Sequence, residues 1–256
     1  MHRDPLPLDD TALLRYSRHI LLPELGLEAQ ERFGVASALV VGVGGLGAPV
    51  AQFLAAAGVG SLILADPDRV DLTNLQRQIL YATADVGTPK VAAASGRLSA
   101  INPLVKIETI EGRIGADELG ALAARVDIVV DCCDNFATRH AVNRACVVHR
   151  TPLVSGAAIR FDGQVAVFDR RDPASPCYHC LFGEGEALEE TRCAVMGVFA
   201  PIVGIVGATQ AAEALKVLAT VGESLAGRLL LLDALAMRWR EVRVTRDPAC
   251  AVCGSA

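Results

Sequence analysis

Aromatic side chains and excess positive charge are both scarce in this chain of 256 residues. Only 4% of the residues are aromatic although 52% are hydrophobic, so we expect an aliphatic, alanine-rich core, which is typical of wound parallel sheets. The formal net charge is -5, which argues against a nucleic-acid partner, because neutralising a phosphate backbone takes a basic face. We find neither an internal repeat nor a low-complexity tract, and the length suits one large α/β domain.

The sequence also lacks a convincing membrane span or leader. The uncharged run at 194–212 is interrupted by Pro201 and by glycines, and it leads into Glu213 and Lys216. We interpret it as a buried helix with a proline near its first turn. The start of the chain is polar and has no apolar stretch of the signal-peptide kind. The sequence therefore predicts a cytoplasmic protein with no membrane partner.

A glycine loop lies between two short apolar runs. Residues 38–41 predict a buried strand, 48–57 a helix that Gly58 ends, and 61–66 a second strand that ends in Asp66. The apolar face of the helix is expected to carry Val50, Phe53, Leu54 and Ala57. The loop glycines are Gly42, Gly44, Gly45 and Gly47. This pattern predicts a βαβ nucleotide half, with loop N–H groups facing an anion and Asp66 accepting ribose hydroxyls. A tight turn without a ligand is the alternative.

Basic and amide residues follow the acid. They are Asn74-Leu75-Gln76-Arg77-Gln78 and then Pro89-Lys90. A hydride-transfer enzyme has no obvious use for Arg and Lys aimed at phosphates. An enzyme that breaks a triphosphate does, because negative charge accumulates there as the bond breaks. A further strand at 126–131 runs into residues 132–135, so Asp134 should stand at the carboxyl edge of the sheet, where open α/β sheets bind ligands.

The predicted architecture is an α/β fold with a Rossmann-like, doubly wound, mainly parallel sheet extended by antiparallel strands. We expect one domain over 1–256, with an N-terminal helical arm (1–34), a nucleotide-binding half (35–168) and a third part at 169–256. That third part holds a long crossover loop at 169–192, a zinc site and C-terminal strands. The other predicted helices are 13–33, 90–101, 138–149 and 203–218, and the other strands are 152–154, 163–168, 228–232 and 239–244.

Eight cysteines in an intracellular-looking enzyme indicate metal or thiol chemistry before disulfides. Four of them form two Cys-x-x-Cys pairs in turn-like settings, Cys177/Cys180 and Cys250/Cys253. Two such pairs make a closed tetrahedral zinc site, which would join the crossover loop to the C-terminal tail. Redox dithiols are the alternative. His179, inside the first pair, is interpreted as a bystander.

The other cysteines have different settings. Cys132, Cys133 and Cys146 fall on strand-end and helix positions and are expected to be small core residues. Cys193 lies at the end of the acidic loop, just before the uncharged helix, where a thiol could be exposed to the helix N-terminus. A functional thiol and a plain loop cysteine both stay open there.

Together these motifs resemble the ThiF/MoeB/HesA family, the bacterial relatives of ubiquitin-activating E1 enzymes. The resemblance covers essentially the whole chain and rests on residues 15–18, 42–47, 57–60, 74–78, 87–90, 131–135, 151–156, 201–204 and both cysteine pairs. Residues 155–160 and the tail at 232–254 are most similar to the MoeB (molybdopterin) branch, with the ThiF (thiamine) branch as the alternative. Residues 193–197 depart from the MoeB pattern because they lack an acidic residue.

The resemblance implies ATP-dependent adenylation of the C-terminal Gly-Gly carboxylate of a ubiquitin-like sulfur-carrier protein. It implies ATP and Mg²⁺, a structural Zn²⁺, a homodimer and a sulfurtransferase as candidate sulfur donor. By resemblance Asp66 holds the ribose, Arg77 and Lys90 the triphosphate charge, and Asp134 the Mg²⁺, while Arg18 reaches in from the neighbouring subunit. The nucleotide-binding set is completed by the loop glycines with Thr73, Asn74, Leu75, Gln76 and Asn135.

The chemistry supports this interpretation independently. A chain-terminal carboxylate, with a pKa of about 3.5, is already a nucleophile at neutral pH. No general base is therefore required, which fits a sequence without an evident Ser/His/Asp or Cys/His constellation. Two alternatives of other classes remain: an NAD-dependent oxidoreductase, which the glycine loop and Asp66 would also suit, and a nucleotide-sensing scaffold without turnover. Neither needs Arg77, Lys90 and Asp134 together.

Overall fold

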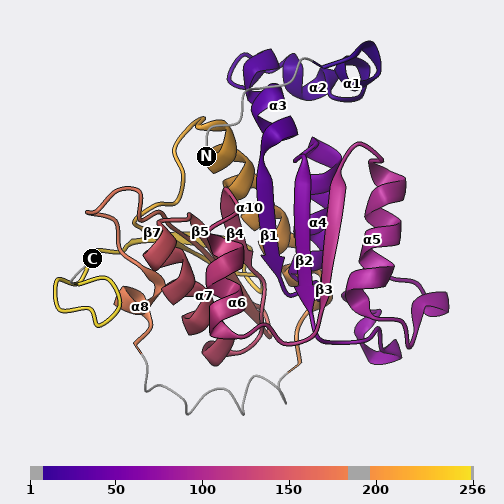
Figure 1. Ribbon diagram of the computed structural model, residues 1–256. Coiled ribbons are helices and arrows are strands. Elements are labelled where there is room, and N and C mark those ends of the chain that lie inside the picture. Colours follow the sequence, from indigo (N-terminus) through magenta and orange to yellow (C-terminus); the bar gives the residue numbers. More distant parts are fainter. Residues whose placement is uncertain (1–7, 184–196, 255–256) are drawn as a thin grey trace.

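Eight strands form one sheet in the computed structural model, which describes residues 8–183 and 197–254 (Figure 1). The strand order is β3-β2-β1-β4-β5-β6-β7-β8. The strands are β1 Ser37–Val41, β2 Ser61–Asp66, β3 Lys106–Glu111, β4 Ile128–Asp131, β5 Leu153–Ile159, β6 Asp162–Phe168, β7 Arg228–Asp233 and β8 Arg238–Arg243. Neighbouring strands from β3 through β2, β1 and β4 to β5 pair in parallel, and neighbouring strands from β5 to β8 pair antiparallel. The predicted fold class is confirmed.

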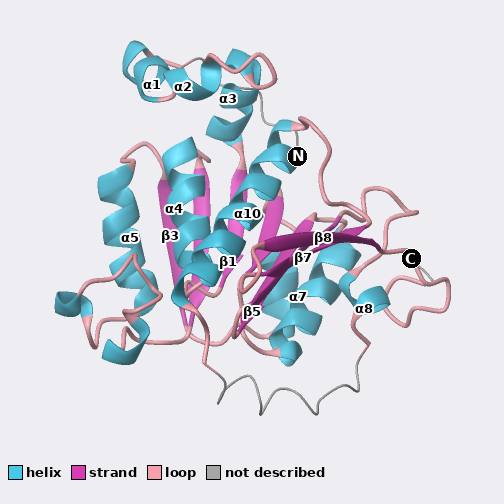
Figure 2. Cartoon of the chain, turned by 180° about the vertical axis from the view of Figure 1, so that it is seen from behind, coloured by secondary structure: helices cyan, strands magenta, loops and turns pink. Residues whose placement is uncertain are grey.

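Helices cover both faces of this sheet. They are α1 Asp10–Arg15, α2 Ser17–Ile20, α3 Gly26–Val35, α4 Gly47–Ala57, α5 Lys90–Ile101, α6 Ala116–Ala123, α7 Phe136–His149, α8 Tyr178–Leu181 and α10 Ala200–Ala219, with 3-10 turns η1 Leu72–Asn74 and η2 Thr83–Asp85. Figure 2 shows α4, α5 and α10 over one face, and Figure 1 shows α6 and α7 over the other. Successive side chains of a strand point to opposite faces. Accordingly, Val40 lies in the core under α4 and α10, and Leu39 in the core under α6 and α7.

The N-terminal arm packs at the amino-terminal ends of β1 and β2. The predicted helical arm is present but is divided into three helices, α1 to α3. The Tyr16 ring fits against Gly58, which takes a left-handed conformation (φ +85°) and ends α4 as predicted. The Tyr16 hydroxyl accepts a hydrogen bond of 2.8 Å from the buried Asn102 side chain. The arm is thus joined to the end of the sheet where the parallel strands begin, opposite the glycine loop (Figure 1).

One prediction about the fold is wrong, and some elements were not predicted. Phe53 was expected on the apolar face of α4, but its side chain is 53% exposed. The elements β3 and α6 were not predicted at all. β3 is an edge strand whose side chains are mostly exposed, so its sequence carries no apolar run. Tertiary pairing with β2, rather than local pattern, makes it a strand.

Helix α10 is the uncharged run identified in the sequence. By length and composition it could cross a membrane, yet 56% of its apolar window is buried inside the protein. It packs against α4, β5 and β6 and begins at Ala200, with Pro201 in its first turn. α10 is therefore a core helix of this fold, as predicted.

The contact between α10 and α4 depends on Gly207. A Cβ at this position would lie 2.5 Å from both the Leu46 carbonyl oxygen and Pro49 Cγ. We expect Gly207→Ala to lower the free energy of unfolding by about 1–3 kcal/mol, since overpacking forces the helices apart. Urea unfolding measures this.

Gly204 on the same helix is the matched control, because a Cβ there meets no atom within 4 Å. Gly204→Ala should leave stability unchanged or raise it by up to about 1 kcal/mol through helix propensity. Equal destabilisation by the two substitutions would show that close packing at Gly207 is not the cause.

Candidate nucleotide site and cysteine cluster

The glycine loop joins the end of β1 to the start of α4. Gly42 has φ +86°, and a Cβ there would lie 2.9 Å from the Cys132 carbonyl oxygen. A Cβ on Gly47 would lie 1.8 Å from the Gly42 carbonyl oxygen. Glycine is therefore required at both positions for the loop to close against the end of β4. The loop ends at the N-terminus of α4, a position that favours a phosphate.

Asp66 lies beneath this loop at the carboxyl end of β2. Its Oδ2 accepts 2.7 Å from the Val43 N–H, and its Oδ1 accepts 2.8 Å from the Asp68 N–H. Burial raises the pKa of Asp66, and the charge of Lys90 and the two N–H groups oppose that shift. Each carboxylate oxygen keeps a second lone pair, so the side chain can still accept the hydroxyls of a sugar.

Lys90 is the buried cation of the site. Its residue is only 4% exposed, and its Nζ donates a 2.8 Å hydrogen bond to Asp68 Oδ2. The Asp68 side chain is 63% exposed, so the ion pair lies at the rim of the site. A buried ammonium requires an anionic partner, so a phosphate that replaces Asp68 would keep its charge compensated.

The amide and basic cluster lies beside the loop. Asp71 caps η1 through the Thr73 N–H (2.8 Å), and Arg77 Nη2 donates to Asn74 Oδ1 at 3.0 Å. Gln78 is buried next to Gly44, and its Oε1 has no hydrogen-bond partner among the described residues. An unpaired buried acceptor is costly unless a ligand supplies a donor. Gln78 belongs to the predicted amide and basic motif, but no separate role was predicted for it.

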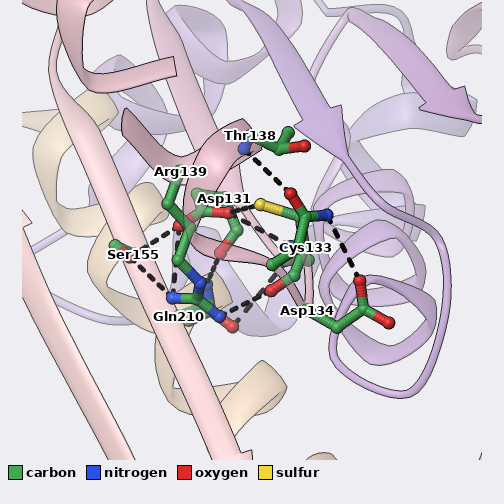
Figure 3. A network of polar contacts seen from close by, with 9 residues as sticks. Asp131, Cys133, Asp134, Thr138, Arg139, Ser155 and Gln210 are labelled. Carbon is green, nitrogen blue, oxygen red and sulfur yellow. Dashed lines mark hydrogen bonds and ion pairs between the residues drawn. The ribbon is translucent and has the colours of Figure 1, made fainter. Parts of the chain in front are cut away.

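A buried network fixes the segment at residues 132–135 (Figure 3). Asp131 at the end of β4 is 1% exposed and accepts from Ser155 Oγ at 2.7 Å and from Arg139 Nη1 at 3.4 Å. Arg139 Nη2 also donates to the Cys133 carbonyl oxygen at 2.5 Å. The Asp131 carbonyl oxygen accepts from Gln210 of α10 at 2.8 Å. The buried ion pair joins β4 to α7, and the hydrogen bonds of Ser155 and Gln210 add β5 and α10 to the same network.

The network leaves Asp134 itself exposed. On its other side Asn135 is the N-cap of α7, where Oδ1 accepts 2.9 Å from the Thr138 N–H. The Asp134 carboxylate accepts a hydrogen bond of 3.4 Å from Asn135 Nδ2. Because the backbone is held on both sides, its remaining lone pairs are positioned to bind a hard cation such as Mg²⁺. Cys132 and Cys133 are buried, and burial raises their pKa well above that of a free thiol. They are core residues, as predicted.

The structure brings most of the predicted nucleotide residues to one edge of the sheet. The Gly42–Cys132 approach joins the loop to the Asp134 segment, and the Val43–Asp66 bond joins it to β2. Tyr81 Oη donates to the Val43 carbonyl oxygen at 2.7 Å and connects the loop to the residues after the amide cluster. Arg18 lies elsewhere, on α2 at the opposite edge (Figure 1). Cys193 falls outside the described residues.

The four paired cysteines form a second candidate site. Their Sγ atoms all lie within 4.8 Å of one another, with Cys177–Cys180 at 3.9 Å, Cys177–Cys250 at 3.7 Å and Cys180–Cys253 at 3.4 Å. Tetrahedral zinc with Zn–S bonds of about 2.3 Å requires sulfur atoms roughly 3.8 Å apart. The cluster therefore fits zinc, and it joins the start of α8 to the C-terminal turn.

His179 does not enter this set of four sulfur atoms, which agrees with its interpretation as a bystander. Its ring lies edge-on to His140 of α7 with the centroids 5.6 Å apart. The residues that sequence reasoning missed are Asp131, Arg139, Ser155 and Gln210. Asp131 and Ser155 are the polar residues of otherwise apolar strands, whereas Arg139 lies on a helix with several other polar residues and has no such local signal.

Comparison with known proteins gives a consistent result. The model of the ThiF family matches residues 16–252. The sulfur carrier protein adenylyltransferase of Thermus thermophilus is 48% identical over 244 residues, covering 94% of this chain and 90% of that protein. The molybdopterin-synthase adenylyltransferase of Escherichia coli is 44% identical over 250 residues, covering 96% and 98%. The Escherichia coli sulfur carrier protein ThiS adenylyltransferase is 41% identical over 247 residues, covering 96% and 97%.

A solved structure is similar as well. The structure of Escherichia coli MccB with ATP superposes with a TM-score of 0.83 at 25% identity, covering 94% of this chain and 73% of that one.

The Asp131 network generates a stability prediction. Ser155→Ala removes a hydrogen bond to a buried carboxylate and should lower the free energy of unfolding by about 1.5–3 kcal/mol. Urea unfolding of the purified protein measures the difference.

Ser37→Ala is the matched control. Ser37 Oγ also donates to a carboxylate at 2.7 Å, but its acceptor, Asp127, is exposed. Its loss should cost about 1 kcal/mol or less, because water replaces the bond. If Ser155→Ala cost no more than Ser37→Ala, the buried network would not be a stabilising element.

Proposed function

The chain belongs to the ThiF family, and on that premise we propose that it adenylates the C-terminal carboxylate of a ubiquitin-like sulfur-carrier protein at the expense of ATP. The observation that carries the proposal is the convergence of Asp66, Lys90 and the Asp134 segment on one glycine loop. Three relatives, each more than 40% identical to this chain over nearly their full length, are named for the same reaction class.

The reaction requires alignment and charge compensation. The carrier carboxylate is already ionised, since its pKa is about 3.5, and no general base is needed. One of its oxygens attacks the α-phosphorus, the bond from that phosphorus to the bridging oxygen breaks, and pyrophosphate leaves with the electron pair. Two anions must meet during this step, so positive groups that contact the phosphates lower the barrier.

Each site residue has a role in this scheme. Asp66 accepts the ribose hydroxyls, and the amide of Gln78 lies where the nucleotide would meet the glycine loop. Lys90 and Arg77 bind the triphosphate, with Lys90 exchanging Asp68 for phosphate oxygens. Asn74 orients a phosphate through its side-chain amide. Mg²⁺ bound with ATP supplies further positive charge, and Asp134, with Asn135 beside it, would hold that ion.

Arg18 can take part only from a second copy of the chain. Its helix lies at the edge of the sheet opposite the glycine loop of its own chain. A homodimer in which the arm of one protomer reaches the nucleotide site of its partner would solve this geometry. We include such a homodimer in the proposal.

The identity of the carrier is a finer question. Residues 155–160 and 232–254 favour a molybdopterin-type carrier, and a thiamine-type carrier is the alternative. A sulfurtransferase would deliver sulfur to the adenylate, and Cys193 is a candidate thiol for that later step. We propose that all of these events occur in the cytoplasm. ATP–pyrophosphate exchange with each carrier in turn identifies the substrate.

Arg77→Ala and Lys90→Ala test the phosphate contacts. Loss of one preorganised positive donor typically lowers the rate about 10²–10³-fold. We expect both variants to lose carrier-dependent pyrophosphate exchange to this extent.

Arg97→Ala is the control for charge alone. Arg97 is also cationic, but its carboxylate partner Asp85 lies on η2 and its side chain is about half exposed. Its removal should leave the exchange unchanged. Full exchange by Lys90→Ala with a retained fold would remove Lys90 from the site.

Zinc in the four-cysteine cluster is the metal part of the proposal. We expect one zinc per chain, and we expect Cys177→Ser and Cys250→Ser to lose it with a lower melting temperature. Since the two cores of the sheet lie outside the cluster, unfolding should not be complete, unlike in small zinc domains.

Cys146→Ser is the control, because Cys146 is buried in the core under α6 and α7 and is not part of the cluster. It should lower stability while retaining one zinc per chain. Metal analysis of the wild type that finds no zinc in a fully stable protein would contradict the zinc assignment.

A further inference from the structure

Helix α7 connects the cysteine cluster to the Asp134 segment. It begins at Phe136, directly after the segment at 132–135, and its middle turn faces the first cysteine pair. Two residues on this helix, Arg139 and Asn143, are spaced by four and therefore lie on one face, one turn apart. Each is buried, and each contacts a different functional region.

Asn143 contacts the cysteine cluster. The residue is 1% exposed, and its Nδ2 donates to Cys177 Sγ at 3.7 Å. Its Oδ1 accepts 2.9 Å from the Tyr178 N–H, which is the first backbone N–H of α8. Donation to a metal-bound thiolate is the kind of contact that orients a ligand and tunes its metal. The position of Asn143 is thus directly coupled to that of the Cys177 sulfur.

Tyr178 closes the connection to Arg139. Tyr178 is buried between α7 and the sheet. The Arg139 guanidinium donates a hydrogen bond to the Tyr178 hydroxyl. The neighbouring residues Cys177 and Tyr178 therefore contact α7 at two successive turns. Arg139 continues the path through its bond to the Cys133 carbonyl oxygen, one residue before Asp134.

We propose that Asn143 and Tyr178 are positioning residues of the nucleotide site, because they hold α7 and Arg139 in register with the cysteine cluster. Zinc in the cluster and MgATP at the Asp134 segment then strengthen each other's binding. Equilibrium coupling is reciprocal, so any factor by which zinc tightens MgATP also applies to zinc when MgATP is bound. The proposal rests on the proposed function only for the identity of the nucleotide.

The experiment measures zinc release from the intact protein to a chromogenic chelator, with and without MgATP. For the wild type we expect MgATP to slow release about fivefold or more, the usual lower range of coupling. Tyr178→Phe keeps the ring and its edge contacts with Phe168 and His140. It removes the hydroxyl that accepts a hydrogen bond from Arg139. It should retain one zinc per chain, but MgATP should scarcely slow its zinc release, so that the release rates with and without MgATP are nearly equal.

Asn143→Asp is the second variant. It keeps an acceptor for the Tyr178 N–H but removes the donor to Cys177, so release without nucleotide should become faster and the protection smaller. Thr151→Val is the control: it removes a buried hydroxyl that donates to the Ala123 carbonyl oxygen at 2.8 Å, away from this path. Its protection by MgATP should equal that of the wild type.

Two results would overturn the proposal: no protection in a wild type that binds MgATP, or full protection in Tyr178→Phe and Asn143→Asp. Carrier-dependent pyrophosphate exchange is measured in parallel to keep the two hypotheses separate. Exchange without protection contradicts the coupling alone, whereas protection without exchange contradicts adenylation alone.

Discussion

The buried ion pair between Asp131 and Arg139 is the interaction on which the arrangement of the candidate site depends. Both residues are nearly inaccessible to water, so each charge has lost its hydration and must be satisfied by the other and by neighbouring dipoles. Ser155 and the Cys133 backbone supply those dipoles. Breaking such a pair by removal of one partner typically costs about 3–5 kcal/mol. The pair is therefore costly to disturb, and the segment after β4 is held rigidly because the Cys133 backbone is hydrogen-bonded to both members of the pair.

Several features follow from this constraint. The Cys132 carbonyl group is held where Gly42 packs against it, so the position of the glycine loop depends on the same network. Gln210 binds the Asp131 carbonyl oxygen and places α10 against β4, while Gly156 leaves the space that the Gln210 side chain fills. The polar site and the apolar core are thus built on shared residues. Lys90 and Arg77, in contrast, are held by partners at the rim, Asp68 and Asn74.

Much of the fold follows from local sequence pattern. The strands at β1, β2 and β4 are continuous apolar runs, which is the pattern of a parallel strand buried on both faces. The cysteine cluster was predictable because two Cys-x-x-Cys pairs are specific even when 73 residues separate the partners. β3 was missed because an exposed edge strand has no such run. Phe53 was misplaced because helical periodicity identifies a face but not whether another element covers it.

The candidate site was predictable only where local sequence pattern marks its residues. Glycines, Asp66, Lys90 and Asp134 are marked by motifs that end strands or begin helices, and the structure brings these positions together. Asp131, Arg139 and Gln210 are held by contacts between residues up to 79 positions apart, and no local pattern announces them. Arg18 cannot be judged from one chain, since the role proposed for it needs a second copy. The sequence thus specifies which groups can meet the nucleotide better than it specifies what holds them in place.

The most direct test of adenylation is the mass of the carrier protein after incubation with this enzyme and MgATP, with inorganic pyrophosphatase present to draw the reaction forward. The account predicts that AMP becomes attached to the C-terminal carboxylate of one sulfur carrier, and that a carrier lacking its final glycine is not modified. Unmodified carrier in every case, despite tight MgATP binding, would contradict the account and favour a nucleotide-sensing protein without turnover.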